Sequence, residues 1–306
     1  MRLVGKILAV LVIAVALILA GLAMFTTPLY RVRSYAQFMT SWSNHWPLSR
    51  GQYLPYRVAP VLESVGFLQK VRYEIEPGVA FMVEPKDVIE VGLLATGTWD
   101  EDIWDWIKGY LQPGRVMIDV GAHIGTMTLR GAKAVGETGK VLAVEPNPDT
   151  VAKLQANIAA SHARNIIVEP VAAGSKPGEL ELFIGSKINS GTSSLSKENA
   201  EEHGAHNAQS VKVPIQRLDD LVEKAGLTRI DIIKVDVEGA ETQVLTGGME
   251  SIKKYHPVLV LETVDAMLKN MGSSLAELEA LLQSLGYERT RESADHANAI
   301  WSPKTK

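Results

Sequence analysis

The sequence predicts an α/β fold in which helices cover both faces of a mostly parallel sheet. Short apolar runs alternate with segments of helical spacing from residue 116 to the end of the chain. The first of these runs leads directly into a turn that carries two glycines, Gly121 and Gly125. Such alternation is typical of right-handed βαβ units, whose parallel strands are buried on both faces.

Length and composition are those of a globular protein. The chain has 306 residues, of which 46% are hydrophobic and 22% are charged, so one large domain or one domain with an appendage is expected. The formal net charge of -4 gives no indication of nucleic-acid binding. The absence of cysteine excludes disulfides, thiolate zinc sites and cysteine nucleophiles.

The N-terminus predicts a transmembrane anchor within residues 1–28. Residues 7–25 form an uncharged apolar run, with two basic residues shortly before it and two shortly after it. A run of about 19 residues is long enough to cross the core of a bilayer. A cleaved signal peptide is the alternative, because small side chains occur near residue 22. Because basic residues flank the run on both sides, the positive-inside rule does not determine its orientation.

Residues 29–110 are interpreted as an aromatic-rich juxtamembrane segment followed by a small α/β extension. The tyrosines and tryptophans near its start either lie at the membrane interface or pack on the globular domain. Residues 71–92 alternate in the manner of short strands, with a turn at residues 76–78. A helix with acidic residues in its first turn is expected from residue 99 to about residue 111.

The main α/β domain is placed at residues 111–306. Strands are expected at residues 116–120, 141–145, 166–168 with 171–173, 179–184, 211–213, 230–237, 258–262 and 298–301. Helices are expected at residues 124–135, from 148 through 157, from about 240, and up to 285 after a capping box at 274–277. In such a sheet the ligand crevice lies outside the carboxyl ends of the strands.

The turn after the first strand indicates which cofactor this crevice holds. Dinucleotide-binding turns read G-x-G-x-x-G, and their second glycine lets the backbone touch a pyrophosphate. Here His123 stands two residues after Gly121. A cofactor without phosphate, S-adenosylmethionine (SAM), therefore fits better than NAD. A junction that binds no ligand is the alternative, and His123 is interpreted as a turn residue rather than a catalytic group.

Acidic side chains occur at the carboxyl ends of three predicted strands. Glu145 lies about 20 residues beyond the glycine turn, where an acidic side chain accepts hydrogen bonds from ribose hydroxyls. Lys234, Asp236 and Glu238 alternate along another strand, so they would share one face, where three charges are costly unless they pair or serve a site. Glu262 ends the next strand. The alternatives are a helix N-terminal charge at Glu145 and a purely structural Lys234–Asp236 pair.

A long polar stretch at residues 185–210 interrupts the alternation. A loop of this length inside a compact domain is usually functional or disordered. Ser194 is a candidate to line the cofactor, whereas His203 and His206 are interpreted as part of a solvated loop, because no third metal ligand of suitable spacing is near.

Five segments resemble the FkbM family of SAM-dependent methyltransferases. They are residues 116–126, residues 144–148, the pair Ala172–Ala173, the pair Ser193–Ser194, and residues 231–241, which are the most specific. The resemblance covers about residues 95–265. It implies a Rossmann-like class I methyltransferase sheet of seven strands, the last of them antiparallel. It also implies methyl transfer to an oxygen of a sugar or secondary metabolite.

The resemblance also implies roles for the candidate site residues. Asp119 and Gly121 would shape the methionine end of SAM, Glu145 would hold the ribose and Ala172 would adjoin the adenine. The remaining candidate cofactor contacts are His123, which stands where the family usually has Asn, together with Gly125, Asn147 and Ser194. The candidate catalytic residues are Asp236 as the first choice of general base, Lys234 as the second, and Glu238 or Glu262 to orient the acceptor or the base. No metal is assigned, although a magnesium-type ion on Asp236 and Glu262 is an alternative.

The predicted protein is thus a single-pass membrane enzyme that methylates a hydroxyl of a small-molecule, glycan or lipid-linked acceptor. Because SAM is supplied in the cytosol, the catalytic domain is expected on that side. An NAD-linked oxidoreductase and a non-catalytic, membrane-tethered SAM-binding module are the alternatives. The sequence identifies neither the acceptor nor the oligomeric state.

Overall fold

The computed structural model describes residues 26–45, 54–185, 188–202 and 209–304. The chain divides into two compact units, one made of Met1–Ile75 and Phe81–Trp99, the other of Glu76–Ala80 and Asp100–Lys306. The apolar run at residues 7–25, and with it the predicted anchor, lies outside the described residues. Among the residues that are described, no helix is both long enough and apolar enough to cross a membrane.

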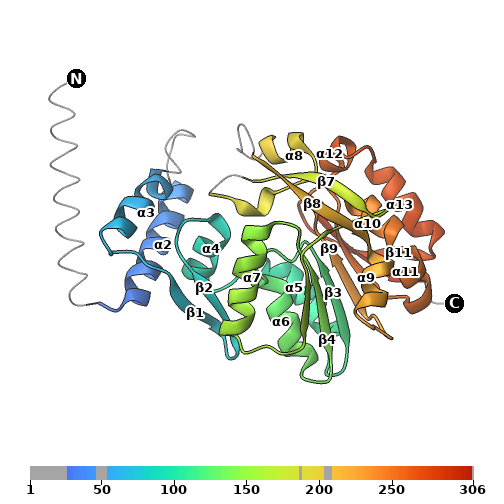
Figure 1. Ribbon diagram of the computed structural model, residues 1–306, viewed down its shortest axis with the longest axis horizontal. Helices are drawn as coiled ribbons and strands as arrows, with labels where there is room; N and C mark the ends of the chain where they lie inside the picture. Colours follow the sequence, from blue (N-terminus) through green and yellow to red (C-terminus); the bar gives the residue numbers. More distant parts are fainter. Residues whose placement is uncertain (1–25, 46–53, 186–187, 203–208, 305–306) are drawn as a thin grey trace. The chain divides into compact units, whose positions relative to one another are not determined.

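The described part of the smaller unit is mainly helical (Figure 1). Its helices are α2 (Pro28–His45), α3 (Leu54–Ser64) and α4 (Val88–Thr96). Helix α2 contacts both α3 and α4. It buries Val32, Tyr35, Ala36 and Met39, a spacing that places all four side chains on one helical face.

Strands β1 (Val71–Glu76) and β2 (Val79–Val83) form a two-stranded sheet, which confirms the predicted turn at residues 76–78. The strand-like interpretation of residues 88–92 is wrong, because they begin helix α4. Asp87 caps this helix by accepting a hydrogen bond from the backbone N–H of Ile89. Helix α4 buries residues on most of its circumference, and a short apolar run does not distinguish a buried helix from a strand.

The larger unit is built on a seven-stranded sheet with the order β11-β12-β10-β9-β3-β4-β5. Its strands are β3 (Val116–Val120), β4 (Lys140–Val144), β5 (Ile166–Glu169), β9 (Ile232–Val235), β10 (Val258–Glu262), β11 (Tyr287–Glu292) and β12 (Asn298–Pro303). The pairs β3–β4, β3–β9, β4–β5 and β9–β10 are parallel. The last strand, β12, is antiparallel to both of its neighbours. The predicted mostly parallel sheet with an antiparallel last strand is therefore confirmed.

Helices cover both faces of this sheet. They are α5 (Glu101–Ile107), α6 (Thr126–Val135), α7 (Pro148–Ala160), α8 (Lys197–Glu202), α9 (Leu218–Lys224), α10 (Glu241–Gly247), α11 (Met249–Tyr255), α12 (Asp265–Asn270) and α13 (Leu275–Ser284), with short 3₁₀ turns η1 (Lys108–Tyr110) and η2 (Ser190–Thr192). Ile118 of β3 belongs to the core under α9, α10 and α13, and Met117 to the core under α5 and α6. Every residue of β3 is buried, as expected for a central parallel strand.

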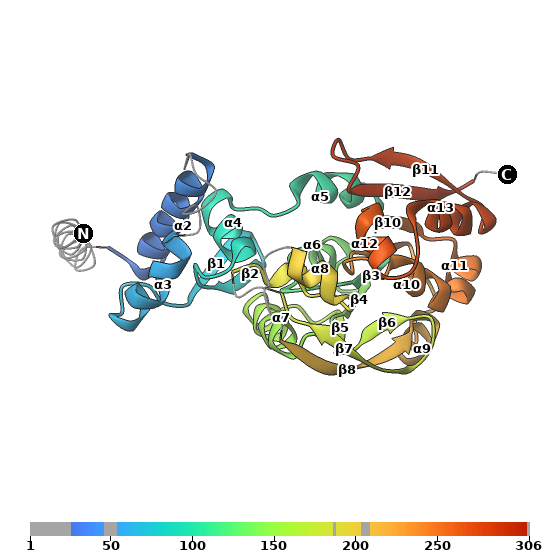
Figure 2. The ribbon, with the colours of Figure 1, turned by 90° about the horizontal axis from the view of Figure 1, so that it is seen from above.

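A second, three-stranded sheet follows β5 in the chain. It has the order β6-β8-β7, with β6 (Ala172–Gly174) parallel to β8 (Ser210–Arg217) and β7 (Gly178–Phe183) antiparallel to it. This small sheet contacts α9 and α10 (Figure 2). Its strands lie between β5 and β9 in the chain. The predicted strands at 179–184 and 211–213 belong to this small sheet.

Most predicted elements of the larger unit are present, with boundaries shifted by a few residues. The helix expected to run to residue 111 instead ends at Ile107 and continues as η1. Helix α5 belongs to the larger unit, so this unit includes residues before 111. The sequence did not predict β11, because its residues are mostly charged and exposed.

Candidate active site

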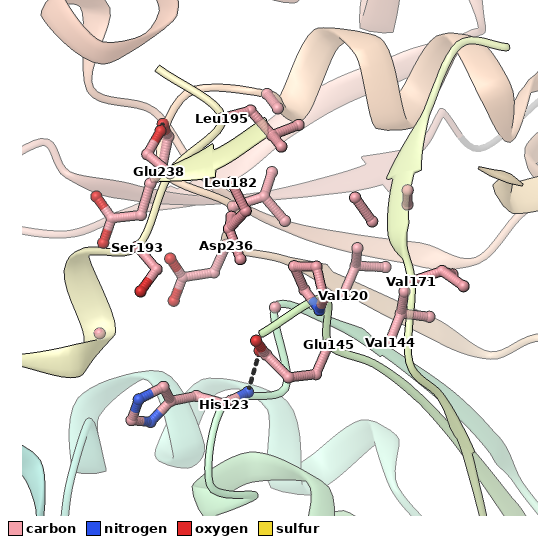
Figure 3. A pocket seen from close by; sticks show the side chains of 18 of the residues that line it. Val120, His123, Val144, Glu145, Val171, Leu182, Ser193, Leu195, Asp236 and Glu238 are labelled. Atoms are coloured by element: carbon pink, nitrogen blue, oxygen red, sulfur yellow. Dashed lines mark hydrogen bonds between the residues drawn. The ribbon is translucent and has the colours of Figure 1, made fainter. Parts of the chain in front are cut away.

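A pocket opens at the carboxyl edge of the parallel sheet. Its walls come from the residues that follow β3, β4 and β9, from β6 and β7, and from the segment 190–195. The empty space, including the open mouth, is about 590 Å³. In Figure 3, Val120, Val144 and Val171 line one side, and the carboxylates of Asp236 and Glu238 lie on the other. One wall is therefore apolar and the opposite wall is acidic.

Gly121 forms the floor of the turn that enters this pocket. Its φ of 82° lies in the left-handed region, which glycine adopts without the steric cost of a Cβ atom. A Cβ atom added here would collide with the backbone carbonyl oxygen of Asp236. The turn after β3 and the end of β9 are thus in direct backbone contact, and only glycine permits that approach.

Glu145 lies at the end of β4 with both carboxylate oxygens held by backbone. The N–H of His123 donates to Oε2 at 2.9 Å, and the N–H of Asn147 donates to Oε1 at 2.9 Å. The side chain lines the pocket (Figure 3) although only 6% of the residue is exposed. Burial raises the pKa of Glu145 to about 7, against the opposing effect of the two N–H donors. Each carboxylate oxygen of Glu145 can accept a second hydrogen bond from a further donor.

Lys234 and Asp236 form an ion pair at the end of β9. The Nζ atom of Lys234 lies 2.9 Å from Asp236 Oδ2 and 3.9 Å from Asp119 Oδ1. The Lys234 side chain is 7% exposed, whereas that of Asp236 is 33% exposed and lines the pocket. Burial would lower the pKa of Lys234, but Asp236 and Asp119 outweigh burial and raise it above its ordinary value. The buried member of the pair is therefore a cation.

Two further carboxylates adjoin Asp236. One oxygen from each of Asp236, Glu238 and Glu262 lies within 4.8 Å of the other two, a spacing that could hold a metal ion. Burial, followed by the charge of Asp236, raises the pKa of Glu238 to about 8. Burial and the same neighbour raise the pKa of Glu262 well above its ordinary range. Within the described residues, Glu262 Oε2 is buried without a hydrogen-bond partner.

The reason for this clustering differs from the predicted one. Strand β9 ends at Val235, and Glu238 has a φ of 55°. The prediction that Lys234, Asp236 and Glu238 share one face of a strand is therefore wrong. The chain turns after β9, and the carbonyl oxygen of Glu238 accepts hydrogen bonds from Ser194 Oγ at 2.9 Å and Asn199 Nδ2 at 2.7 Å. These bonds fix the turn that brings Glu238 to the pocket.

The candidate cofactor contacts divide into two groups. Those that line the pocket are Gly121, His123, Glu145, Ala172 and Ser194. The other three lie behind its wall. Asp119 is buried in β3 and accepts a 2.5 Å hydrogen bond from Thr128 Oγ1. A Cβ atom at Gly125 would lie 2.7 Å from Leu154, and the side chain of Asn147 caps α7 by accepting from the N–H of Asp149 at 3.1 Å. Of the catalytic candidates, Asp236 and Glu238 line the pocket, whereas Lys234 and Glu262 support it from behind.

The segment 190–195 supplies pocket residues that the sequence did not single out, namely Ser190, Gly191 and Leu195. Ser190 Oγ lies 2.8 Å from Nε2 of His123, which links this segment to the glycine turn. The polar composition of residues 185–210 was the available signal, but it did not identify individual residues. His203 and His206 lie outside the described residues.

Glu241 is a further residue that the sequence did not single out. It is buried at the start of α10, and its Oε1 accepts the backbone N–H of Val237 at 3.1 Å and of Gly239 at 3.3 Å. Burial raises the pKa of Glu241 to about 7. This carboxylate stabilises the turn after β9 and does not line the pocket.

The strand order, the antiparallel last strand and a pocket beside the first glycine turn together define a class I methyltransferase fold. A family model described as the methyltransferase FkbM domain matches residues 119–289, more than half of the chain. The chain therefore belongs to the FkbM methyltransferase family, and the resemblance seen in the sequence is confirmed. It is a SAM-dependent methyltransferase rather than an NAD-linked oxidoreductase.

Several characterised proteins are similar to this chain. Methyltransferase sdnD of Sordaria araneosa is 30% identical over 212 residues, which cover 61% of this chain and 77% of that protein. Hexuronic acid methyltransferase AglP of Haloferax volcanii is 30% identical over 187 residues, 60% of this chain and 70% of that protein. The crystal structure of a methyltransferase FkbM from Methylobacillus flagellatus has 16% identity and a TM-score of 0.43, covering 80% of this chain and 59% of that one. A structural likeness of that size has no bearing on function.

Proposed function

We propose that SAM binds in the pocket at the carboxyl edge of the sheet and that the enzyme methylates a hydroxyl oxygen. The observation that carries this proposal is the position of Glu145. Its carboxylate is buried at the end of β4, lines the pocket and is fixed by two backbone N–H groups. A fixed acceptor at this place in an α/β sheet suits the paired hydroxyls of a ribose.

The pocket also suits the other parts of SAM. Val144, Val171 and Ala172 supply apolar lining of the kind against which an adenine ring packs. Asp236 and Glu238 place two carboxyl groups across from it. When bound, SAM supplies a methyl group already activated by its sulfonium. The protein then has to align the acceptor and remove its proton.

Asp236 is the general base of this proposal. It lines the pocket and is a third exposed, so an acceptor hydroxyl can reach it. Asp236 would accept the proton of the acceptor hydroxyl as the methyl group passes from the sulfonium sulfur, which is left as a neutral thioether, to the acceptor oxygen. A positioned base of this kind contributes about 10²–10⁴-fold to the rate. Its raised pKa keeps Lys234 protonated, so Lys234 cannot accept a proton and instead holds this carboxylate in place. Glu238, which also lines the pocket, orients the acceptor, and Glu262, whose carboxylate lies close to that of Asp236, orients the base.

The acceptor of this proposal is a sugar hydroxyl on a small-molecule, glycan or lipid-linked substrate. One relative is named for action on a hexuronic acid, which supports a sugar. The apolar run at residues 7–25 supports a single-pass anchor, and the need for SAM supports a catalytic domain on the cytosolic side. An anchored enzyme would meet lipid-linked acceptors at the membrane surface.

Methyl transfer from isotopically labelled SAM tests this proposal on the full chain. The protein is screened against glycan and lipid-linked sugar acceptors, and equilibrium dialysis measures SAM binding on the same sample. Labelled product with a methyl ether on the acceptor is expected. Tight SAM binding without product over the whole panel would instead identify a non-catalytic SAM-binding module, and an absence of SAM binding would refute the site itself.

A further inference from the structure

Helix α3 carries apolar residues on its outer face as well as on its inner face. The inner face buries Tyr56, Ala59 and Leu62. On the outer face, Val58 is 40% exposed and Val61 is 61% exposed, and Val65, just past the helix end, is 71% exposed. Their spacing of three and four residues places the three valines in one stripe, which we call the valine stripe.

The valine stripe is unusual for a helix that faces water. Pro60, Ser64 and Gly66 are also exposed, and the charged side chain of Glu63 is 40% exposed and pairs with Lys86 at 2.6 Å. A surface helix normally turns charged and polar side chains outward. Single exposed apolar residues are ordinary, but an aligned set indicates a surface that contacts a membrane or another protein.

The start of α2 lies next to the end of α3. The guanidinium of Arg31 donates through Nε to the carbonyl oxygen of Phe67 at 3.2 Å, and through Nη1 to that of Thr26 at 3.0 Å. Leu29 and Tyr30 in the same turn are 38% and 62% exposed. One arginine thus ties the chain at residue 26 to the segment that directly follows the valine stripe.

Position along the chain indicates what covers the stripe. The uncharged apolar run ends at residue 25, and the next residue is held beside Phe67 by Arg31. If the run crosses a bilayer, the Val65 end of the stripe lies where the chain leaves the lipid. Tyrosine and apolar side chains at such a place settle in the headgroup layer.

We propose that the valine stripe, with Leu29 and Tyr30, lies in the interfacial layer of a lipid bilayer and forms a second membrane contact beside the anchor. This inference depends on the proposed anchor and not on the methyltransferase chemistry. A helix lying in the interface fixes how the smaller unit is held at the membrane, which a single spanning segment does not do.

The chain contains no cysteine, so one introduced cysteine gives a single labelling site. Val61→Cys in the full chain is labelled with an environment-sensitive fluorophore and reconstituted into phosphatidylcholine vesicles, with and without doxyl-labelled lipid. The matched control is Lys212→Cys on β8, whose native side chain is 69% exposed. We expect the Val61 label to be quenched by the doxyl lipid about twofold or more and to resist aqueous iodide, with the reverse at Lys212.

Other outcomes overturn the proposal. Quenching of the Val61 label by iodide would show that water covers the stripe. Protection from iodide without doxyl quenching would show that protein covers it, either a second copy or another part of this chain. Failure of the protein to float with vesicles would refute the anchor and the stripe together. SAM binding, measured on each labelled protein, reports separately on the methyltransferase site.

Discussion

The ammonium of Lys234 lies 2.9 Å from Asp236 Oδ2, at the point where β9 ends and the pocket begins. The lysine is buried, whereas its partner reaches the pocket. Removing one member of a buried pair leaves the other without compensation. Because Lys234 is the buried member, a change at Asp236 leaves its ammonium with Asp119 at 3.9 Å as the remaining carboxylate. Asp236 is the better position for a test of catalysis because it reaches the pocket, and the unfolding free energy of the variant is measured alongside its activity.

Asp236→Asn keeps the size of the side chain and removes its capacity to take a proton. We expect kcat to fall by about 10²–10⁴-fold, while the dissociation constant for SAM changes by less than about threefold. Steady-state methyl transfer and equilibrium dialysis measure the two quantities. Asp220→Asn, at a half-exposed carboxylate of α9, is the control and should leave both unchanged. If Asp236→Asn retains full turnover, Asp236 is not the base.

Glu145→Gln tests the ribose contact. The amide presents one acceptor oxygen where the carboxylate presents two, so one of the backbone N–H groups of His123 and Asn147 loses its acceptor. The ribose hydroxyls likewise lose one of the two acceptor oxygens. Because a hydrogen bond to a charged group contributes about 1.5–3 kcal/mol, calorimetry should show that the variant binds SAM roughly 10–100-fold more weakly. Asn147→Ala is the control. It removes the cap of α7, which costs about 1 kcal/mol of stability, and leaves SAM affinity near that of the wild type. Equal effects of the two changes on SAM binding would contradict this role for Glu145.

Sequence periodicity was sufficient for the central strands of the sheet because they are buried on both faces and read as apolar runs, whereas the charged edge strand β11 was missed. The carboxyl edge, and with it Glu145 and Gly121, followed from topology alone. Residues placed by irregular backbone were harder to predict. Glu238 reaches the pocket through a turn with positive φ, and Ser190 through a 3₁₀ turn. Neither conformation leaves a periodic pattern in the sequence.

Periodicity also failed to reveal two helices of the smaller unit, α3 and α4. Helix α4 and the strands before it have similar apolar composition, and residues 88–96 are too short for helical spacing to stand out. Helix α3 was not predicted at all, and it contains Pro60. Its helical state depends on packing of Tyr56, Ala59 and Leu62, which is tertiary information.

Gly121→Ala should disrupt the turn into the pocket. The added Cβ collides with the carbonyl oxygen of Asp236, so the ends of β3 and β9 must separate. Gly226→Ala is the control, because Gly226 has a φ of 61° with no atom near its Cβ position. Gly226→Ala should lower the free energy of unfolding by about 1–2 kcal/mol, because the alanine must adopt a left-handed backbone conformation. We expect Gly121→Ala to cost more in denaturant unfolding and to abolish measurable SAM binding. Equal costs for the two alanines would show that the backbone approach imposes no constraint.

Stability should fall as the pH rises from about 5 to 8. Burial raises the pKa of Glu145 and Glu241 to about 7 and that of Glu238 to about 8, from an ordinary value of 4.5. Between these limits the folded protein holds more protons than the unfolded chain, so the free energy of unfolding decreases with pH. For these three groups the free energy of unfolding is highest below pH 4.5, and the raised pKa of Glu262 acts in the same direction. Carboxyls with a lowered pKa, such as Asp231, act only below about 3.8.

Urea unfolding at a series of pH values measures this dependence. Glu238→Gln should flatten the slope between pH 5 and 8, because glutamine has no proton to lose. Stability that rises with pH in this interval, or a slope that Glu238→Gln leaves unchanged, would show that these carboxyls are not buried as the structure has them.

Metal removal should leave activity intact, although the oxygens of Asp236, Glu238 and Glu262 are close enough to hold a cation. The ammonium of Lys234 already faces Asp236 at 2.9 Å, so a cation is present beside the cluster without a metal ion. After dialysis against EDTA, kcat should stay within about twofold, and added Mg²⁺ should not raise it. A loss of activity that Mg²⁺ restores, and that Glu262→Gln makes irreversible, would instead identify the three carboxylates as metal ligands.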